Sequence, residues 1–377
     1  MKLAQVGLVS LVLIGLLLVA CGRRGGQGAA PGREAPAPSL PTAAPVATSA
    51  ARPASTPVPP TSAPPSGLSD RIGAVDNINY RDKRGSFPEL ALAKNAGIGW
   101  IRTGIPWSEV EPRQGQFEWQ VPDAFVAQAR SQGLQLLIIL NSSPRWISTR
   151  SGIRGHLAPP KDYSLWGNYV YQTVSRYKRD VHYWEIWNEP DLVGSWPGTP
   201  GEYAQLLAVA YQSVKRADPS AQVLFAGLAL NDSPRENPRF FQEVLADPSY
   251  PGTRSFDIAN IHVYGPLSEA QRRLAGTRAT LEQAGVGDRP IWVTETGYSD
   301  DPGYQQVPEF KGPQGQVEYL RTVVPYLLQQ GAAKVFWYQL YDFATAGGGF
   351  KNYGLLDEQL RPKPAYTALR SLIEAER

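Results

Sequence analysis

From residue 71 onward, hydrophobic and polar positions follow two alternating patterns along the chain. Short apolar runs are separated by longer stretches in which apolar residues recur every three or four positions. The short runs are rich in β-branched and aromatic residues, which is typical of buried strands. They predict eight strands, over 72–79, 99–105, 134–141, 182–188, 222–228, 257–264, 290–296 and 334–341.

The longer stretches predict amphipathic helices between these strands. Thr199 followed by Glu202 is typical of a helix start, and glycines stand where several helices should end. The helices are predicted over 87–96, 122–133, 164–179, 202–216, 238–246, 268–284, 315–330 and 364–376. Eight strand–helix alternations indicate an α/β fold, a (β/α)8 TIM barrel. A doubly wound open sheet is the alternative, but it usually carries a glycine-rich phosphate loop after its first strand, which 77–82 lacks.

The amino-terminal segment has the features of a targeting signal. Lys2 precedes an apolar run over 7–20, which is shorter than the roughly 20 residues that a spanning helix needs. The run ends at Cys21, and 18–22 resembles the lipobox of bacterial lipoproteins. This resemblance implies a signal peptide over 1–20, lipidation of Cys21 and a membrane-anchored protein at the cell surface or in the periplasm. The alternative is an ordinary or uncleaved signal in which the cysteine is incidental.

The segment that follows is predicted to be a disordered linker. Residues 22–67 contain eleven prolines and no aromatic residue, so they cannot bury enough apolar surface to offset the entropy of ordering. The predicted organisation is therefore a signal peptide (1–20), a lipidated cysteine with a linker (21–67) and a catalytic barrel domain (68–377).

Composition and charge exclude several classes of function. The chain has 37 Lys and Arg, 34 Asp and Glu, three His and one Cys. Five basic residues and one acid in 1–67 give that part about +4, which leaves about −1 for the barrel. A nearly neutral barrel argues against nucleic acid as a partner. One Cys and three separate His favour neither a disulfide framework nor a metal site, so no metal or cofactor is expected, and no obligatory protein partner is evident.

In barrels of this kind, the carboxyl ends of the strands carry the chemistry. Two glutamates, one arginine and several amides and aromatic rings lie at these predicted ends, and together they suit hydrolysis of a glycosidic bond. They are Asn77, Asn79, Arg102, Trp107, Asn141, Trp146, Asn188, Glu189, Asn231, Asp232, His262, Tyr264, Glu295, Tyr298, Trp337 and Tyr341.

Two of these strand ends carry recognisable motifs. The segment 187–191 reads Trp-Asn-Glu-Pro-Asp, and 292–298 reads Trp-Val-Thr-Glu-Thr-Gly-Tyr. They resemble clan A of the glycoside hydrolases, retaining (β/α)8 enzymes with an Asn-Glu pair on strand 4 and a nucleophilic Glu on strand 7. Members of families 39 and 5 look closest. Further matches are Arg102, the segment 107–112, His262, Tyr264, Trp337 and the segment 361–366.

The resemblance implies a role for each matching residue. Glu295 would be the nucleophile and Glu189 the general acid and base, with their carboxyl groups roughly 5 Å apart. Arg102 and Tyr264 would stabilise ionised Glu295. The remaining residues would bind substrate: Asn188 at the sugar 2-hydroxyl, Trp146 and Trp337 by stacking, together with Asn141 and His262.

Alternatives remain open for some residues and for the function. His262 could be a core histidine, and Arg102 could serve only as an ion-pair residue in the barrel. The favoured function is a retaining glycoside hydrolase that cleaves β-glycosidic bonds in a polysaccharide or oligosaccharide. Long loops over 144–161, 190–201 and 342–354 favour endo action. The alternative is a catalytically inactive carbohydrate-binding protein on the same barrel.

Overall fold

A computed structural model describes residues 67–80, 85–152, 154–230, 233, 236–303, 307–343 and 352–376. The signal peptide, Cys21 and almost all of the linker predicted from the sequence lie outside these residues. So do Asn231 and Asp232, and most of the loop after the last strand.

Eight parallel strands form the predicted barrel. Their spatial order is β5-β4-β3-β2-β1-β8-β7-β6, and a parallel bridge between Leu224 and Ile258 joins the two ends of that order. The predicted (β/α)8 fold is confirmed. The strands are β1 (Ile72–Val75), β2 (Trp100–Gly104), β3 (Gln135–Leu140), β4 (Tyr183–Ile186), β5 (Gln222–Leu224), β6 (Ala259–Val263), β7 (Ile291–Thr296) and β8 (Ala332–Trp337).

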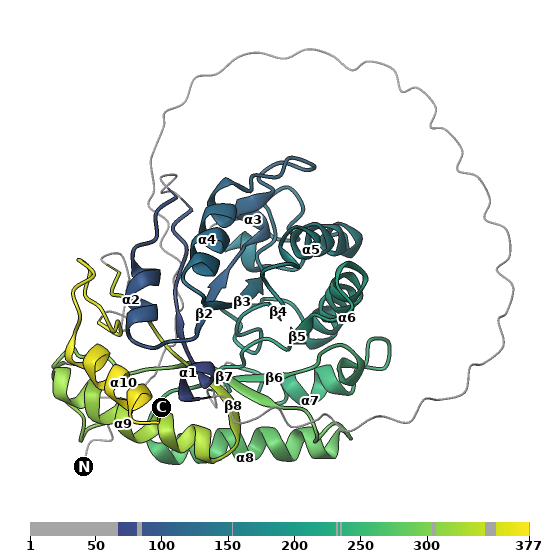
Figure 1. Cartoon of the computed structure of the whole chain (residues 1–377). Helices are drawn as coiled ribbons and strands as arrows, with labels where there is room; N and C mark the ends of the chain where they lie inside the picture. Colours follow the sequence, from purple (N-terminus) through teal and green to yellow (C-terminus); the bar gives the residue numbers. More distant parts are fainter. Residues whose placement is uncertain are drawn as a thin grey trace, which may run out of the picture. The chain divides into compact units, whose positions relative to one another are not determined.

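Helices lie outside the strands, as Figure 1 shows. Each of the eight predicted helices is present, within a few residues of its predicted bounds. They are α2 (Glu89–Asn95), α4 (Gln120–Ser131), α5 (Tyr163–Tyr177), α6 (Pro200–Ala217), α7 (Phe240–Leu245), α8 (Leu267–Gln283), α9 (Gly312–Gln329) and α10 (Pro364–Glu374). The short elements α1 (Leu68–Arg71), α3 (Trp107–Val110), η1 (Gly155–Leu157) and η2 (Gly252–Arg254) were not predicted.

Local signals in the sequence account for several helix ends. The Thr199 hydroxyl accepts the Glu202 backbone N–H at 3.2 Å, and the Glu202 carboxylate accepts the Thr199 N–H at 2.7 Å. This reciprocal capping box starts α6 as predicted. Gly97 and Gly133, which follow α2 and α4, have φ angles of 79° and 66°, a conformation that favours glycine over residues with a side chain.

The amino-terminal half of the barrel interior is filled by aromatic rings. Trp100 packs edge to face against Tyr183 and Trp292, with centroids 5.0 and 5.4 Å away, and Trp292 stacks on Phe336 at 6.0 Å. Gly73 of β1 makes room for this packing, because a Cβ there would come within 2.2 Å of the Phe336 ring. The rings form a packed base below the carboxyl ends of the strands.

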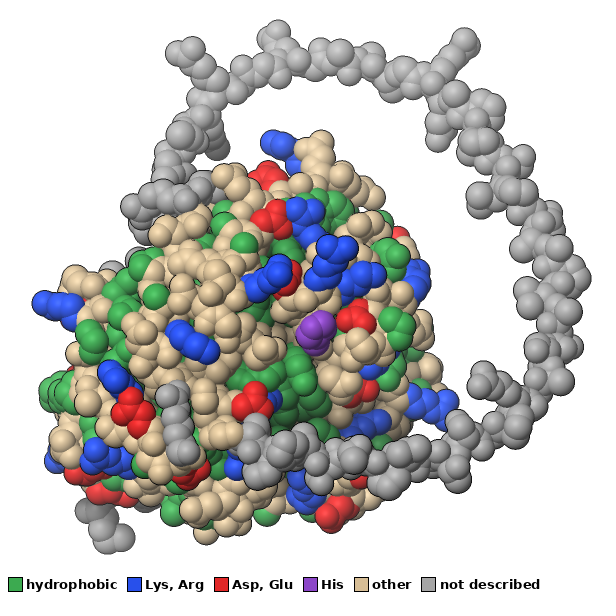
Figure 2. Space-filling view, in the orientation of Figure 1, with side chains coloured by type: hydrophobic (Ala, Val, Ile, Leu, Met, Phe, Trp, Pro, Cys, Tyr) green, Lys and Arg blue, Asp and Glu red, His purple; other side chains and the backbone are tan. Residues whose placement is uncertain are grey.

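The surface carries charges of both signs. Figure 2 shows acidic and basic side chains dispersed among polar and apolar ones over the face in view. None of the helices in the described part of the chain is both long enough and apolar enough to cross a lipid bilayer.

Candidate active site

A buried arginine at the centre of the barrel connects the two strands that carry the predicted catalytic glutamates. Arg102, on β2, is 1% exposed. Its Nε and Nη2 donate to the two carboxylate oxygens of Glu185 on β4, at 2.7 and 2.8 Å. Its Nη1 donates to Glu295 Oε1 at 2.7 Å, and its Nη2 also donates to Asn188 Oδ1 at 2.7 Å. One guanidinium therefore fixes the positions of three side chains.

Glu295, on β7, has a donor at each carboxylate oxygen. Arg102 donates to Oε1, and the Tyr264 hydroxyl donates to Oε2 at 2.7 Å. The Tyr264 ring packs edge to face against Tyr338 and Tyr353, with centroids 6.3 Å away in each case. These two donors fix the orientation of the Glu295 carboxyl group, and a nucleophile has to be held in place beside the reacting atom.

Glu189 lies on an unusual stretch of backbone just after β4. Trp187 and Glu189 have φ angles of 73° and 49°, and the Glu189 N–H donates to the Gly227 carbonyl at 3.0 Å. Left-handed backbone at residues with side chains costs about 1–3 kcal/mol each and is frequent at functional sites. The consequence here is that the Glu189 side chain, 4% exposed, faces the barrel interior.

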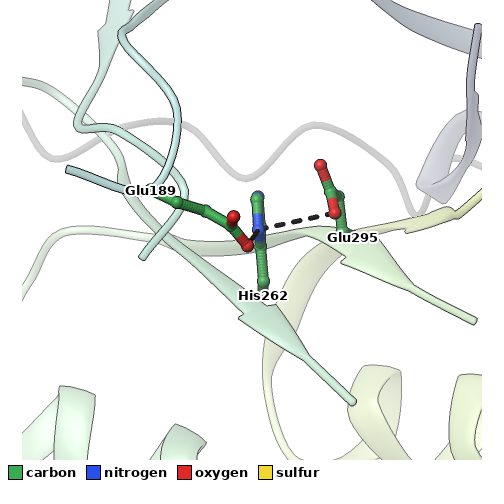
Figure 3. A group of neighbouring side chains, drawn as sticks. All are labelled: Glu189, His262 and Glu295. Atoms are coloured by element: carbon green, nitrogen blue, oxygen red, sulfur yellow. Dashed lines mark hydrogen bonds and ion pairs between the residues drawn. The ribbon is translucent and has the colours of Figure 1, made fainter. Parts of the chain in front are cut away.

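His262, on β6, lies between the two glutamates, as Figure 3 shows. Its Nδ1 is 2.9 Å from Glu189 Oε1 and 3.5 Å from Glu295 Oε2. Its Nε2 is 3.4 Å from Arg102 Nη2. A proton on Nε2 would point at the N–H groups of Arg102 Nη2, so the neutral ring carries its proton on Nδ1, which donates to Glu189. The predicted alternative of a simple core histidine is therefore incomplete, since this ring contacts the site directly.

Space for the histidine ring comes from Gly227, which lies just after β5 (Gln222–Leu224). A Cβ at Gly227 would come within 2.1 Å of His262 Nε2. The Gly227 N–H also donates to Glu185 Oε1 at 2.9 Å. Gly227 thus supports both the histidine and the arginine partner.

The two sides of this cluster differ in their protonation. Burial raises the pKa of the Glu189 carboxyl to about 7, although the positive charges of Arg102 and Arg273 act in the opposite direction. Burial lowers the pKa of His262 to about 4, so the ring is neutral near pH 7. Glu189 Oε2 is buried and has no hydrogen-bond partner among the described residues. With Oε1 accepting from His262, Oε2 is the atom that can carry the acid proton.

The separation of the two glutamates matches one class of glycosidase. One ligand atom from each of Glu189, His262 and Glu295 lies within 4.8 Å of the others. Carboxyl groups about 5–5.5 Å apart are typical of retaining enzymes, whereas inverting enzymes need about 6.5–9.5 Å.

Such a triad of donors also has the composition of a metal site. The Arg102 guanidinium, however, lies 2.7 Å from Glu295, and both Glu295 oxygens already accept hydrogen bonds. A divalent cation would have to displace these donors and would face a like charge. These contacts do not fit a metal site, and we assign none.

Three other predicted binding residues, Asn188, Asn141 and Trp146, are half-buried. Asn188 is half-buried, and because Arg102 holds its Oδ1, its NH2 group is left to donate to a ligand. Asn141 is half-buried, and Trp146 is also half-buried, with its Nε1 donating to the Glu111 carbonyl at 3.0 Å.

The prediction that Trp337 stacks on a sugar is wrong. Trp337 is 1% exposed, donates from Nε1 to the Tyr353 carbonyl at 3.0 Å, and packs against Tyr319 of α9. It therefore lies outside the barrel wall. Tyr338, the next residue along, is the strand-8 aromatic near the site, because its ring packs edge to face against Tyr264, whose hydroxyl donates to Glu295.

Sequence reasoning missed Glu185 and Asp191. Glu185 was an acid at an inward position of a strand, opposite an inward arginine two strands away, and this pattern could have identified the pair. Asp191 accepts the backbone N–H groups of Ala229 and Leu230 at 3.1 and 2.7 Å. Burial, with a smaller effect from Glu189, raises the pKa of Asp191 to about 7. No spacing in the sequence pointed to that contact.

Comparison with known proteins assigns this fold and site to a family. Residues 163–366, more than half of the chain, match the glycosyl hydrolase catalytic core. The chain belongs to this family, and the predicted class, an O-glycosyl hydrolase resembling clan A, is confirmed at that level.

Two individual relatives share less than a third of their residues with this chain over the aligned segments. A β-xylosidase of Caldicellulosiruptor saccharolyticus is 25% identical over 240 residues, which cover 58% of this chain and 48% of that protein. An endo-1,4-β-xylanase A of Phanerodontia chrysosporium is 29% identical over 143 residues, which cover 35% of this chain and 34% of that protein. The chain thus spans about half the length of the first of these relatives, and less of the second.

Solved structures share the fold. A family 39 glycoside hydrolase from Bacteroides cellulosilyticus WH2 aligns with a TM-score of 0.62 at 22% identity, over 81% of this chain and 64% of that one. A monomeric β-xylosidase from Caulobacter crescentus CB15 aligns with a TM-score of 0.63 at 18% identity, over 82% of this chain and 69% of that one.

Proposed function

We propose that the protein is a retaining glycoside hydrolase that cleaves β-glycosidic bonds. The observation that carries the proposal is a pair of buried glutamates with one oxygen of each within 4.8 Å. Glu295 is held between two hydrogen-bond donors, whereas burial raises the pKa of Glu189 to about 7. Family membership supports the reaction class.

Each step of the mechanism follows from a contact in the site. Glu295, ionised between Arg102 and Tyr264, attacks the anomeric carbon and forms a covalent bond to it. Glu189 Oε2 gives its proton to the glycosidic oxygen as that carbon–oxygen bond breaks. Glu189, now ionised, takes a proton from water, and the resulting oxygen nucleophile displaces Glu295. Two displacements at one carbon retain its configuration. Asn188 donates to the sugar beside the reacting carbon.

The substrate is proposed to be a β-linked oligosaccharide or polysaccharide. β-Xylosides are the first compounds to test, because a β-xylosidase and a xylanase are among the similar proteins. The loops after β3 and β4 are long, which favours an open groove and endo action.

The test uses residues 68–377 against xylans, β-glucans, mannans, galactans and bacterial exopolysaccharides. Released reducing ends are counted, with Glu295→Gln as the blank. Hydrolysis of one polymer that vanishes in the variant supports the proposal, and product lengths separate endo from exo action. Binding to a polymer without hydrolysis, at any pH from 4 to 9, would instead favour a carbohydrate-binding protein.

A second test addresses the role of Glu189. Glu189→Ala should slow substrates with poor leaving groups far more than activated aryl glycosides, because these need less acid assistance. Equal losses for both kinds of substrate would contradict that role. Since Glu189 must hold a proton, activity of the unmodified protein should decline above about pH 7.

The cellular location is a separate proposal. We infer from the sequence around Cys21 that the protein is a lipoprotein anchored outside the cytoplasm. Metabolic labelling with a fatty acid in a bacterial host should mark the full chain and not Cys21→Ala. Labelling of both proteins, or of neither, would contradict the anchor.

A further inference from the structure

Glu185 is the least exposed charged side chain of the site, and the proposed reaction gives it no step. It is 0% exposed. It holds Arg102 through two parallel hydrogen bonds of 2.7 and 2.8 Å and accepts the Gly227 N–H at 2.9 Å. A two-point contact between arginine and a carboxylate fixes the orientation of the guanidinium as well as its place.

That orientation decides which Arg102 hydrogens remain for other groups. Glu185 occupies the edge formed by Nε and Nη2. Nη1 is left for Glu295 at 2.7 Å, and the second Nη2 hydrogen is left for Asn188 at 2.7 Å. Without Glu185, the guanidinium could rotate about its Cδ–Nε bond and loosen both contacts.

Glu185 also changes the charge balance around Glu189. The positive charge of Arg102 favours ionised Glu189, whereas the negative charge of Glu185 opposes it. Further positive and negative side chains also surround Glu189. The charged and titratable groups around it are Arg102 (β2), Glu185 (β4), Asp191 (after β4), Glu236 (after β5), His262 (β6), Arg273 (α8), Glu295 (β7) and Tyr338 (after β8).

We propose that Glu185 is a positioning residue that directs Arg102 towards Glu295 and offsets the positive charge that Arg102 presents to Glu189. The inference rests on the proposed function only for its effect on turnover. Its electrostatic part concerns the folded protein and can be measured without a substrate.

Two variants separate charge from shape. Glu185→Gln keeps the size of the side chain and an oxygen for Gly227 but removes the charge. Glu185→Asp keeps the charge but is one methylene too short for the two-point contact. Glu236→Gln is the matched control, because Glu236 opposes ionisation of Glu189 in the same direction but from a half-exposed loop position.

The first measurement is the titration of the Glu189 carboxyl by carbon-13 NMR, assigned by comparison with Glu189→Gln. We expect Glu185→Gln to lower the pKa of Glu189 by about one unit, since the charge of Arg102 is then less compensated. Glu185→Asp and Glu236→Gln should each lower it by much less. An unchanged titration in folded Glu185→Gln overturns the electrostatic part of the inference.

The second measurement is the pH profile of hydrolysis. In Glu185→Gln the alkaline limb should move down by the same unit. In Glu185→Asp the limb should stay in place while kcat falls about tenfold or more, because Arg102 is misdirected. A residue that served only folding would lower the stability of both variants and leave the limb where it is, and that result overturns the inference.

A folding defect in Glu185→Gln would not prevent the test. Arg102→Met/Glu185→Met replaces the whole buried pair by apolar groups, a change that proteins often tolerate. Because the two charges act on Glu189 in opposite directions, its pKa should then stay within about half a unit of the starting value. A fall of a full unit in this double variant would contradict the balance. If unmodified protein hydrolyses nothing while Glu185→Gln still shifts the titration, only the proposed function fails.

Discussion

The two halves of the barrel interior use opposite kinds of side chain. The amino-terminal half holds the rings of Trp100, Trp292 and Phe336, in edge and stacked contacts. The carboxyl half holds Arg102 and Glu185 with the residues that they connect. Both halves are almost completely enclosed.

This difference separates stability from chemistry within one set of strands. Contacts among the rings of Trp100, Trp292 and Phe336 contribute stability that does not depend on pH, because these three side chains do not ionise. Buried ion pairs contribute little net stability, since the cost of removing charges from water offsets their attraction. The charged half is therefore expected to serve the reaction, and the ring base to hold it rigid.

The largest expected effect comes from the charged half. Glu295→Ala removes the proposed nucleophile, and turnover should fall at least about 10³-fold. Arg102 keeps its two hydrogen bonds to Glu185, so the barrel should stay folded, as judged by circular dichroism. Glu309→Ala is the control, an exposed acid on the loop after β7, and it should hydrolyse substrate at the normal rate. Comparable turnover in both variants would remove Glu295 from the mechanism.

The ring base should show the converse behaviour. Trp292→Ala leaves a cavity among Trp100, Tyr183 and Phe336 and should lower the free energy of unfolding by about 3–5 kcal/mol, measured in urea. Its pH profile of hydrolysis should keep the limbs of the unmodified protein. Tyr250→Ala, at an exposed aromatic residue, should cost less than about 0.5 kcal/mol. A shifted pH profile in Trp292→Ala would mean that the two halves are coupled.

How far the sequence predicts this barrel depends on the kind of signal. The strands and helices follow from periodicity, because apolar runs and amphipathic stretches differ over many residues. The prediction for Trp337 failed because it assigned the wrong face of the strand. Side chains alternate between the two faces of a strand, and since Phe336 and Tyr338 face inward, Trp337 between them faces α9. The pairing of β7 with β8 shifts register near this point, which no pattern along one strand reveals.

The candidate site was predicted unevenly for a similar reason. The motifs imply roles for Glu189 and Glu295. Glu185 lies outside them, and Asp191, the last residue of the first motif, acts through contacts with backbone 38 and 39 residues away. Asp191 reaches the backbone of Ala229 and Leu230, and Leu230 has a φ of 49°. Tertiary packing holds Leu230 in this left-handed conformation, so the sequence alone does not predict which backbone N–H groups Asp191 will reach.

A smaller effect tests the cost of burying an acid in the charged half. The folded pKa of Glu189, about 7, lies above its ordinary value of 4.5. A raised pKa means that the carboxyl favours the folded state below pH 4.5 and that this contribution is lost as pH rises through 7. Glu189→Gln removes that loss. Its stability relative to the unmodified protein should therefore rise by about 2 kcal/mol between pH 5 and pH 8, measured in urea.

The control for this comparison is Glu318→Gln on the exposed side of α9, which should show no pH-dependent difference. A constant difference in Glu189→Gln would mean that the carboxyl is not held in its neutral form by the fold.

The smallest expected effect lies at Lys334, at the amino-terminal end of the ring base. Lys334 is a buried base, so its effect on stability should change with pH in the opposite direction to that of the buried acid Glu189. Its Nζ lies 4.1 Å from the centre of the Trp100 ring and donates to the Asp70 carbonyl at 2.6 Å. Burial nevertheless lowers the pKa of Lys334, so the charged form is disfavoured in the folded state. Lys334→Met should therefore stabilise the protein at pH 7 by about 0.5 kcal/mol, after allowance for solvent screening.

For a lowered lysine pKa the sign of the pH dependence reverses. The unmodified protein regains stability as pH rises and Lys334 loses its proton, so the advantage of Lys334→Met should shrink between pH 7 and pH 10. Hydrolysis should be unaffected, because the ring base separates Lys334 from the glutamates. If the extra stability of Lys334→Met instead grows with pH, the contacts of Lys334 with Trp100 and Asp70 outweigh the cost of burial. The ring base would then stabilise a buried charge, as the carboxyl half does.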